Sequence, residues 1–445
     1  MKVKYIWFII IFLLMFSFPL QVILSSPLPS LLPYLGIFII LLNRPIYYLR
    51  ITEKYYRNKN ITTLIIIYVI LVIFHAIWQV SFKLISLDSA IASFVIYILP
   101  LLFYYYFTYF SVEQNFKTIL IAISICGVIS GLYFAYDSYS MLVLGKVNDF
   151  SFKILNYSAL RANGADQNYA RIVSFSRSHG LLEKHSISAA WIAIGCFSTL
   201  ALVPPKNKSK RFFIVLLYGS MLLISLNFTS IISFLFIILF IEYKGYLLIK
   251  GLISKKTLYT LLAIVIISIS LYFFLKISDS KMYYIINNTI ADQTDLALGD
   301  KSYGHGTYLG SLLDGFLNFF PSNMKLFPLG IFTGDGYATW GVIQKGGDFG
   351  IVETLHRFGL PFFLIIIIGL LRLIKSSINK IETFKLEENI HACYLSFAVS
   401  VTIYLIFSDV HYSIWNAKSI LPIFFICMSL FSRYLQPFPK ETLNN

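Results

Sequence analysis

Long apolar blocks alternate with short polar segments along almost the whole chain. A helix needs about 20 apolar residues to cross the hydrocarbon core of a bilayer, and most of the blocks approach or reach that length. The pattern predicts an all-α polytopic integral membrane protein of about twelve spans, in a single membrane domain over residues 1–445. The expected spans are 5–24, 28–43, 61–82, 90–111, 117–137, 186–204, 212–226, 228–243, 257–276, 350–373, 389–408 and 419–435.

Lysine and arginine gather in every second connection between these spans. They lie at 44–59, 206–211, 244–256 and 372–385. Basic residues accumulate in the cytoplasmic loops of membrane proteins, so these connections are expected on one side with both termini cytoplasmic. The first block, MKVKYIWFIIIFLLMF, lacks a small-residue cleavage site and is expected to stay as the first helix.

The composition supports the same class. Hydrophobic residues make up 58% of the chain and charged residues 13%, whereas a soluble protein carries roughly 25% charged residues. The net charge of +15 follows from the basic loops, so no nucleic-acid partner is expected. Four cysteines, Cys126, Cys196, Cys393 and Cys427, lie inside apolar spans, so neither a disulfide nor a metal site is expected, and no cofactor is implied.

Two connections on the expected outer side are too long to be simple turns: 138–185 and 277–349. Long connections are usually functional or disordered, and these are rich in Tyr, Phe, Leu and Ile, so we expect them to fold against the bundle. The first holds six basic against three acidic residues. The second holds seven aspartates, four lysines and no arginine. The two loops therefore present opposite charge on one face.

The first loop carries Arg161, Arg171 and Arg177, although positive charge is unusual on the outer side. The planar guanidinium suits phosphate, so these side chains could hold a lipid diphosphate. The alternative is that they contact lipid headgroups or neighbouring acidic residues. Arg177 stands directly before a span, where ionisable groups are costly and usually functional. Gly180 would let the backbone approach a ligand closely.

His179, Glu183 and His185 follow at short spacing. If the sixth span begins early, residues 179 and 183 are i, i+4 neighbours on one helix face. Such a pair could deprotonate a sugar hydroxyl as a general base, or it could form a structural hydrogen bond. Both interpretations stay open.

The stretch GGDFGIVETLHRFGLP, 346–361, forms a third group. Asp348 is expected at the mouth of the tenth span, with Glu353, His356 and Arg357 in its first turns. Ionisable residues at membrane depth indicate a site, while a Glu353–Arg357 ion pair that orients the helix is the alternative.

Weaker signals lie in two other places. His305 and Asp335 stand among glycines that could form anion-binding turns. Asp409 and His411, in SDVHYSIWN, are expected at the outer end of the eleventh span, where they could close the site from the other side.

These features resemble the bacterial O-antigen polymerases (Wzy) and the related O-antigen ligases. The resemblance rests on the layout of spans and outer loops and on Arg177-x-x-Gly180 leading into a span. It also rests on PLGIFTGDG (328–336), then Asp348, then LHRFGLPFF (355–363). The chain departs from the pattern where His305 stands in place of a second-loop arginine. It has Asp348-Phe349 where ligases tend to have His-Asn, which favours the polymerase.

The resemblance implies a GT-C-like, metal-independent glycosyltransferase at the periplasmic face of the bacterial inner membrane. Its substrates would be glycans linked to undecaprenyl diphosphate. The implied partners are membrane lipid, a chain-length regulator and a flippase.

The resemblance also implies roles for individual residues. His179, Glu183 or Asp348 would serve as the catalytic base. The diphosphate would be held by Arg177 and Arg171, with further substrate contacts from Arg161, Gly180, His185, His305, His356 and Arg357.

Two other functions fit parts of the pattern. An O-antigen ligase would differ only in its acceptor, lipid A-core. A lipid-linked oligosaccharide flippase or another transporter would also have about twelve spans, but its charged residues should line a central cavity between short loops. This chain has them in long outer loops.

Overall fold

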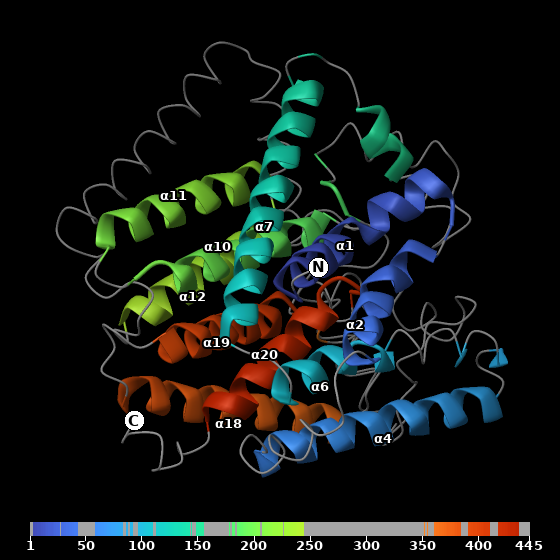
Figure 1. The fold of residues 1–445 in the computed structure, drawn as a ribbon. Coiled ribbons are helices and arrows are strands. Elements are labelled where there is room, and N and C mark those ends of the chain that lie inside the picture. The colour runs from blue at the N-terminus through green and yellow to red at the C-terminus, as the bar shows by residue number, and fades with distance from the viewer. Residues whose placement is uncertain are drawn as a thin grey trace, which may run out of the picture.

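The computed structural model shows a bundle of helices, and none of the residues it describes forms a strand (Figure 1). The described residues are 3–26, 28–42, 58–82, 86–87, 90–91, 97–109, 113–142, 144, 148–154, 178, 180–182, 185–204, 207–225, 227–243, 351, 354, 360–383, 390–409 and 417–435. The helices are α1 (Val3–Leu24), the 3-10 turn η1 (Leu28–Leu31), α2 (Leu32–Leu42), α4 (Lys59–Ser81), α6 (Leu101–Tyr109), α7 (Glu113–Leu142), α10 (His185–Leu202), α11 (Lys208–Ser225), α12 (Phe228–Tyr243), α18 (Leu360–Thr383), α19 (Ile390–Ser408) and α20 (Leu421–Tyr434).

The predicted all-α membrane class is confirmed. Six described helices, α1, α4, α7, α10, α18 and α19, are long and apolar enough to cross a membrane. Every expected span except 257–276 overlaps a described helix, and 257–276 lies outside the described residues.

Several expected helix bounds were wrong for local reasons. The span expected over 90–111 is interrupted by a turn at Leu99–Pro100, and α6 begins after it. Proline lacks a backbone N–H and disfavours helical geometry in the residue before it. Helix α7 continues through Leu142, beyond the expected end at 137. Helix α18 is described from Leu360 to Thr383, with proline in its first turn, where proline is well tolerated, and the described residues Ile351 and Thr354 ahead of it are also helical.

Helices α7 and α10 form the centre of the bundle. At their crossing, a Cβ atom built on either Gly127 or Gly195 would lie 2.8 Å from the Cα of the other. Small residues let membrane helices approach this closely, and packing and hydrogen bonds then hold them. The Ser198 hydroxyl donates to the Leu120 carbonyl at 2.6 Å, and the Ser130 hydroxyl donates to a carbonyl in the first turn of α10 at 2.8 Å. The two helices are therefore antiparallel.

The helices at the edge of the bundle expose apolar side chains. Only 22% of the membrane-length windows of α4 and α18 is buried. These two helices lie side by side at one edge of the bundle, where Leu64 packs over Gly369 (Figure 1). Their exposed isoleucines and leucines are suited to lipid, because hydrocarbon imposes no cost on apolar surface.

The glycine crossing generates a stability prediction. Gly127→Ala should lower the free energy of unfolding by about 1–3 kcal/mol, because the added methyl meets backbone that cannot yield. Gly219→Ala in α11 is the matched control, since a Cβ atom there would lie 3.8 Å from its nearest neighbour. It should not destabilise the protein, because alanine is favoured over glycine in a helix by about 1 kcal/mol. Thermal unfolding of the purified proteins in detergent measures both. An unchanged midpoint for Gly127→Ala would contradict the close crossing.

Candidate functional site

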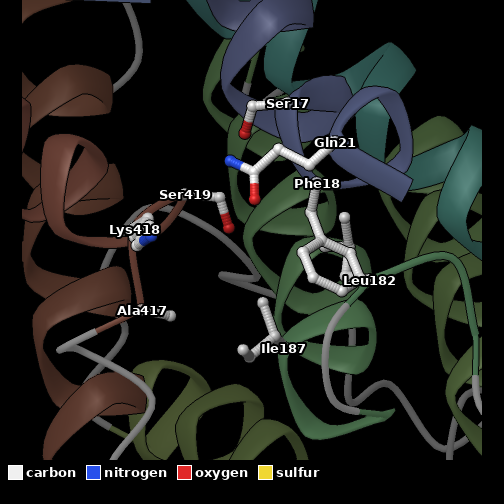
Figure 2. Close-up of a pocket in the computed structure, with 8 residues that line it drawn as sticks. All are labelled: Ser17, Phe18, Gln21, Leu182, Ile187, Ala417, Lys418 and Ser419. Carbon is white, nitrogen blue, oxygen red and sulfur yellow. The ribbon is translucent and has the colours of Figure 1, made fainter. Parts of the chain in front are cut away.

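The C-terminal end of α1 and the beginnings of α10 and α20 enclose a small polar recess (Figure 2). It is lined by Ser17, Phe18, Gln21, Leu182, Ile187, Ala417, Lys418 and Ser419. It offers about 30 Å³ to the centres of water-sized molecules, which is room for about two waters. The recess can therefore hold water, a hydroxyl or a phosphate oxygen, but not a sugar ring.

The polar lining comes from α1 and from the turn before α20. Figure 2 shows the Ser17 and Gln21 side chains of α1 directed toward Ser419, which stands with Lys418 just before α20. Gln21 is 2% exposed, so its carboxamide is held inside the protein. Trp191 Nε1 of α10 donates to the Ser419 hydroxyl at 3.2 Å and fixes the turn against the bundle core. Lysine, hydroxyl and amide groups at one place suit a hydroxylated or anionic group.

The segment 180–182 forms the wall between the recess and α7. Gly180 has a φ of +78°, in the left-handed region that favours glycine. A Cβ atom there would lie 2.7 Å from both Phe134 Cζ and Ser188 Cβ. The backbone N–H of Leu182 donates to the Ser188 hydroxyl at 3.0 Å. This glycine is thus required by close packing against the protein itself.

The buried carboxylate of Asp137 binds Ser178, which lies two residues before Gly180. Asp137, near the end of α7, accepts a hydrogen bond from the Ser178 hydroxyl on Oδ2 and one from the Ser151 hydroxyl on Oδ1, each at 2.7 Å. Asp137 is 5% exposed and Ser178 4%. Two short hydrogen bonds offset part of the cost of burying a carboxylate.

Asp409, at the end of α19, contacts the chain ahead of α18. The Thr354 hydroxyl donates to Asp409 Oδ1 at 3.2 Å, and both side chains are buried. This bond joins the segment ahead of α18 to the end of α19. The prediction that Glu353, His356 and Arg357 lie in the first turns of the tenth span falls outside the described residues.

Two of the predicted site residues are described, Gly180 and His185. His185 is the first residue of α10 and is buried. The condition for an i, i+4 pair of residues 179 and 183 is not met, because α10 begins at His185 and the left-handed Gly180 lies between them. The other predicted site residues lie outside the described residues: Arg161, Arg171, Arg177, His179, Glu183, His305, Asp348, His356 and Arg357.

The sequence patterns did not single out Gln21, Lys418, Ser419 or Asp137. A signal for Asp137 was present in the apolar run GLYFAYDSYSML. A carboxylate inside a membrane segment costs free energy, and such residues usually have a functional role. Gln21 and Ser419 carry no such signal, since single uncharged polar residues are common in membrane helices. Among the described residues no group of three His, Cys, Asp or Glu side chains could hold a metal ion, and the four cysteines are buried and unpaired.

Comparisons with protein-family models, with curated proteins and with solved structures give no match for this chain.

The backbone conformation and close packing of Gly180 predict what a methyl group added at this position would do. Gly180→Ala should destabilise the protein by about 2–5 kcal/mol, through the left-handed backbone and the two clashes together. The thermal midpoint in detergent should fall further than for Gly127→Ala, where only close packing is disturbed. A midpoint equal to that of the native protein would show that the segment repacks without cost.

Proposed function

We propose that the protein is an O-antigen polymerase, a glycosyltransferase that joins undecaprenyl-diphosphate-linked oligosaccharide units at the periplasmic face of the bacterial inner membrane. The observation that carries this proposal is the recess at the helix ends. Its wall, residues 180–182, continues from Arg177 within a few residues, and Lys418 stands on the opposite side. Lys418, two serines and Gln21 line this recess, and such groups suit the phosphate oxygens of a lipid-linked substrate.

The chemistry requires such cations. The acceptor hydroxyl oxygen bonds to the anomeric carbon of the donor glycan, the bond from that carbon to the diphosphate oxygen breaks, and undecaprenyl diphosphate leaves. A base takes the hydroxyl proton, and His179, Glu183 and Asp348 are the candidates. Negative charge grows on the leaving diphosphate, and preorganised donors stabilise it best in a site that excludes water. Arg177, Arg171 and Lys418 are the donors that we assign to it. This leaving group needs no metal ion.

The bundle geometry weighs against a transporter. A flippase needs a central passage, whereas the backbones of α7 and α10 touch at Gly127 and Gly195 in the middle of the described bundle. Ser198 and Ser130 close the same interface with hydrogen bonds to backbone carbonyls.

The topology that we propose has about twelve spans with both termini in the cytoplasm. Contacts among the described helices support it. The end of α1 and the starts of α10 and α20 share the recess, and the end of α7 contacts the segment before α10 through Asp137. The alternation of basic connections assigns all four of these ends to the outer side.

Glycan ladders from cells that lack the gene and carry plasmid variants test the proposal. Arg177→Ala and Lys418→Gln should each remove or greatly shorten the ladder and leave lipid A-core capped by a single repeat unit, because flipping and ligation continue. Arg372→Ala and Lys375→Gln, exposed basic positions on α18, are the matched controls and should give normal ladders.

Expression of every variant is confirmed by immunoblot. Lipid A-core without any attached repeat unit would indicate that the protein is a ligase or a flippase and not a polymerase. A normal ladder from Arg177→Ala would remove Arg177 from the site.

A further inference from the structure

We propose that Arg211 forms a binding site for a phosphate group at the end of the bundle opposite the recess. Arg211 lies in the first turn of α11 and is 2% exposed. Its Nη1 donates to the Val203 carbonyl at 3.0 Å, which holds the guanidinium against the chain that follows α10. Helix α10 has 18 residues and is therefore about 27 Å long. The site is thus separate from the recess at the other end of that helix.

The other two nitrogens of the guanidinium indicate the kind of ligand. Among the described residues, Arg211 Nε and Nη2 are buried side-chain atoms without a hydrogen-bond partner. These two nitrogens are neighbours on one edge of the guanidinium, and their N–H bonds run parallel. Such an edge binds two oxygens of a single phosphate or carboxylate group. The unused donors therefore have the geometry of one bidentate anion site.

The described neighbours of Arg211 supply no counter-charge. In the part of the chain that the structure describes, its electrostatic partners are the thiols of Cys196 on α10 and Cys393 on α19. Both cysteines are buried and free, and thiols in apolar surroundings carry no charge at neutral pH. Arginine keeps its proton in proteins. Because a buried charge without a counter-charge is costly, the guanidinium requires an anion.

The surrounding chain favours phosphate over a carboxylate. The sequence KSKR, residues 208–211, places three cations in the first four residues of α11. The N-terminus of a helix adds partial positive charge and is a common phosphate site. This positive charge suits a group that can carry two negative charges. Ser209 and Lys210 are exposed, so an anion can approach the buried guanidinium through the first turn of α11.

Two sources can supply the phosphate group. The proposed topology assigns this end of the bundle to the cytoplasmic side, where basic pockets between membrane helices bind the phosphates of anionic lipid headgroups. Free phosphate or a soluble phosphate ester offers the same chemistry. In both cases two phosphate oxygens accept hydrogen bonds from Nε and Nη2 of Arg211.

Thermal unfolding of the purified full-length protein in nanodiscs tests the site. Replacing part of the phosphatidylcholine by phosphatidylglycerol should raise the midpoint by about 3–6 °C, the shift expected from a ligand at roughly a hundred times its Kd. In Arg211→Met protein the rise should disappear, because methionine offers no donor. This variant should fold, since an apolar side chain of similar length removes a buried charge that has no partner.

Two further variants separate the site from general attraction between opposite charges. Lys210→Gln is the matched control, because it removes the same charge from the exposed neighbour and should keep the rise. Arg211→Lys keeps the charge but has no edge with two donors, so it should lose more than half of the rise.

A second arm distinguishes the two sources. Inorganic phosphate replaces chloride at equal ionic strength, with the protein in nanodiscs of phosphatidylcholine alone. A rise in this arm that depends on Arg211 supports the site and identifies free phosphate as a source. A rise that depends on Arg211 with phosphatidylglycerol alone supports the site and identifies the lipid headgroup.

An equal rise in native and Arg211→Met protein would mean that the anion acts on the basic surface as a whole, and it overturns the site. The absence of a rise in both arms also overturns it. If Arg211→Met protein does not fold, as judged by gel filtration, Arg211→Lys decides, and a full rise in this variant overturns the site.

Discussion

The contact between the backbones of Gly127 and Gly195 sets the separation of α7 and α10, and the rest of the site depends on it. With the two helices this close and antiparallel, the end of α7 lies beside the start of α10. Phe134 and Asp137 can then reach the segment that leads into α10. Larger residues at the crossing would move this segment away from the carboxylate that holds it. A packing constraint at the centre of the bundle therefore positions polar groups at its end.

Those polar groups interact strongly because they are shielded from water. Asp137, Ser178 and Gln21 are each at most 5% exposed, and electrostatic interactions are stronger in such surroundings than in water. The recess offers about 30 Å³ to the centres of water-sized molecules, so its lining can bind water, a hydroxyl or a phosphate oxygen but not a sugar ring.

The sequence was sufficient to predict the helices that the structure describes and their order. Apolar blocks of membrane length favour helices, because a chain in lipid must satisfy its own backbone hydrogen bonds. It misplaced bounds where local chemistry overrides hydropathy, as at Pro100, which interrupts an apolar run, and at the end of α7, which continues past Asp137 into Leu142. Gly180 was singled out for close approach to a ligand, and the structure shows that its backbone approaches Phe134 and Ser188, because a motif cannot show which protein atoms a glycine will meet. Lys418 and Gln21 were missed because they converge only through the packing of α1 against the turn before α20.

The most direct test of the proposed activity is a reaction with the purified protein in lipid nanodiscs and undecaprenyl-diphosphate-linked repeat units, in EDTA. The account predicts glycans of increasing length that remain on undecaprenyl diphosphate, and one undecaprenyl diphosphate released for each linkage formed. Intact substrate after incubation with folded protein, or a reaction that EDTA abolishes, would contradict it.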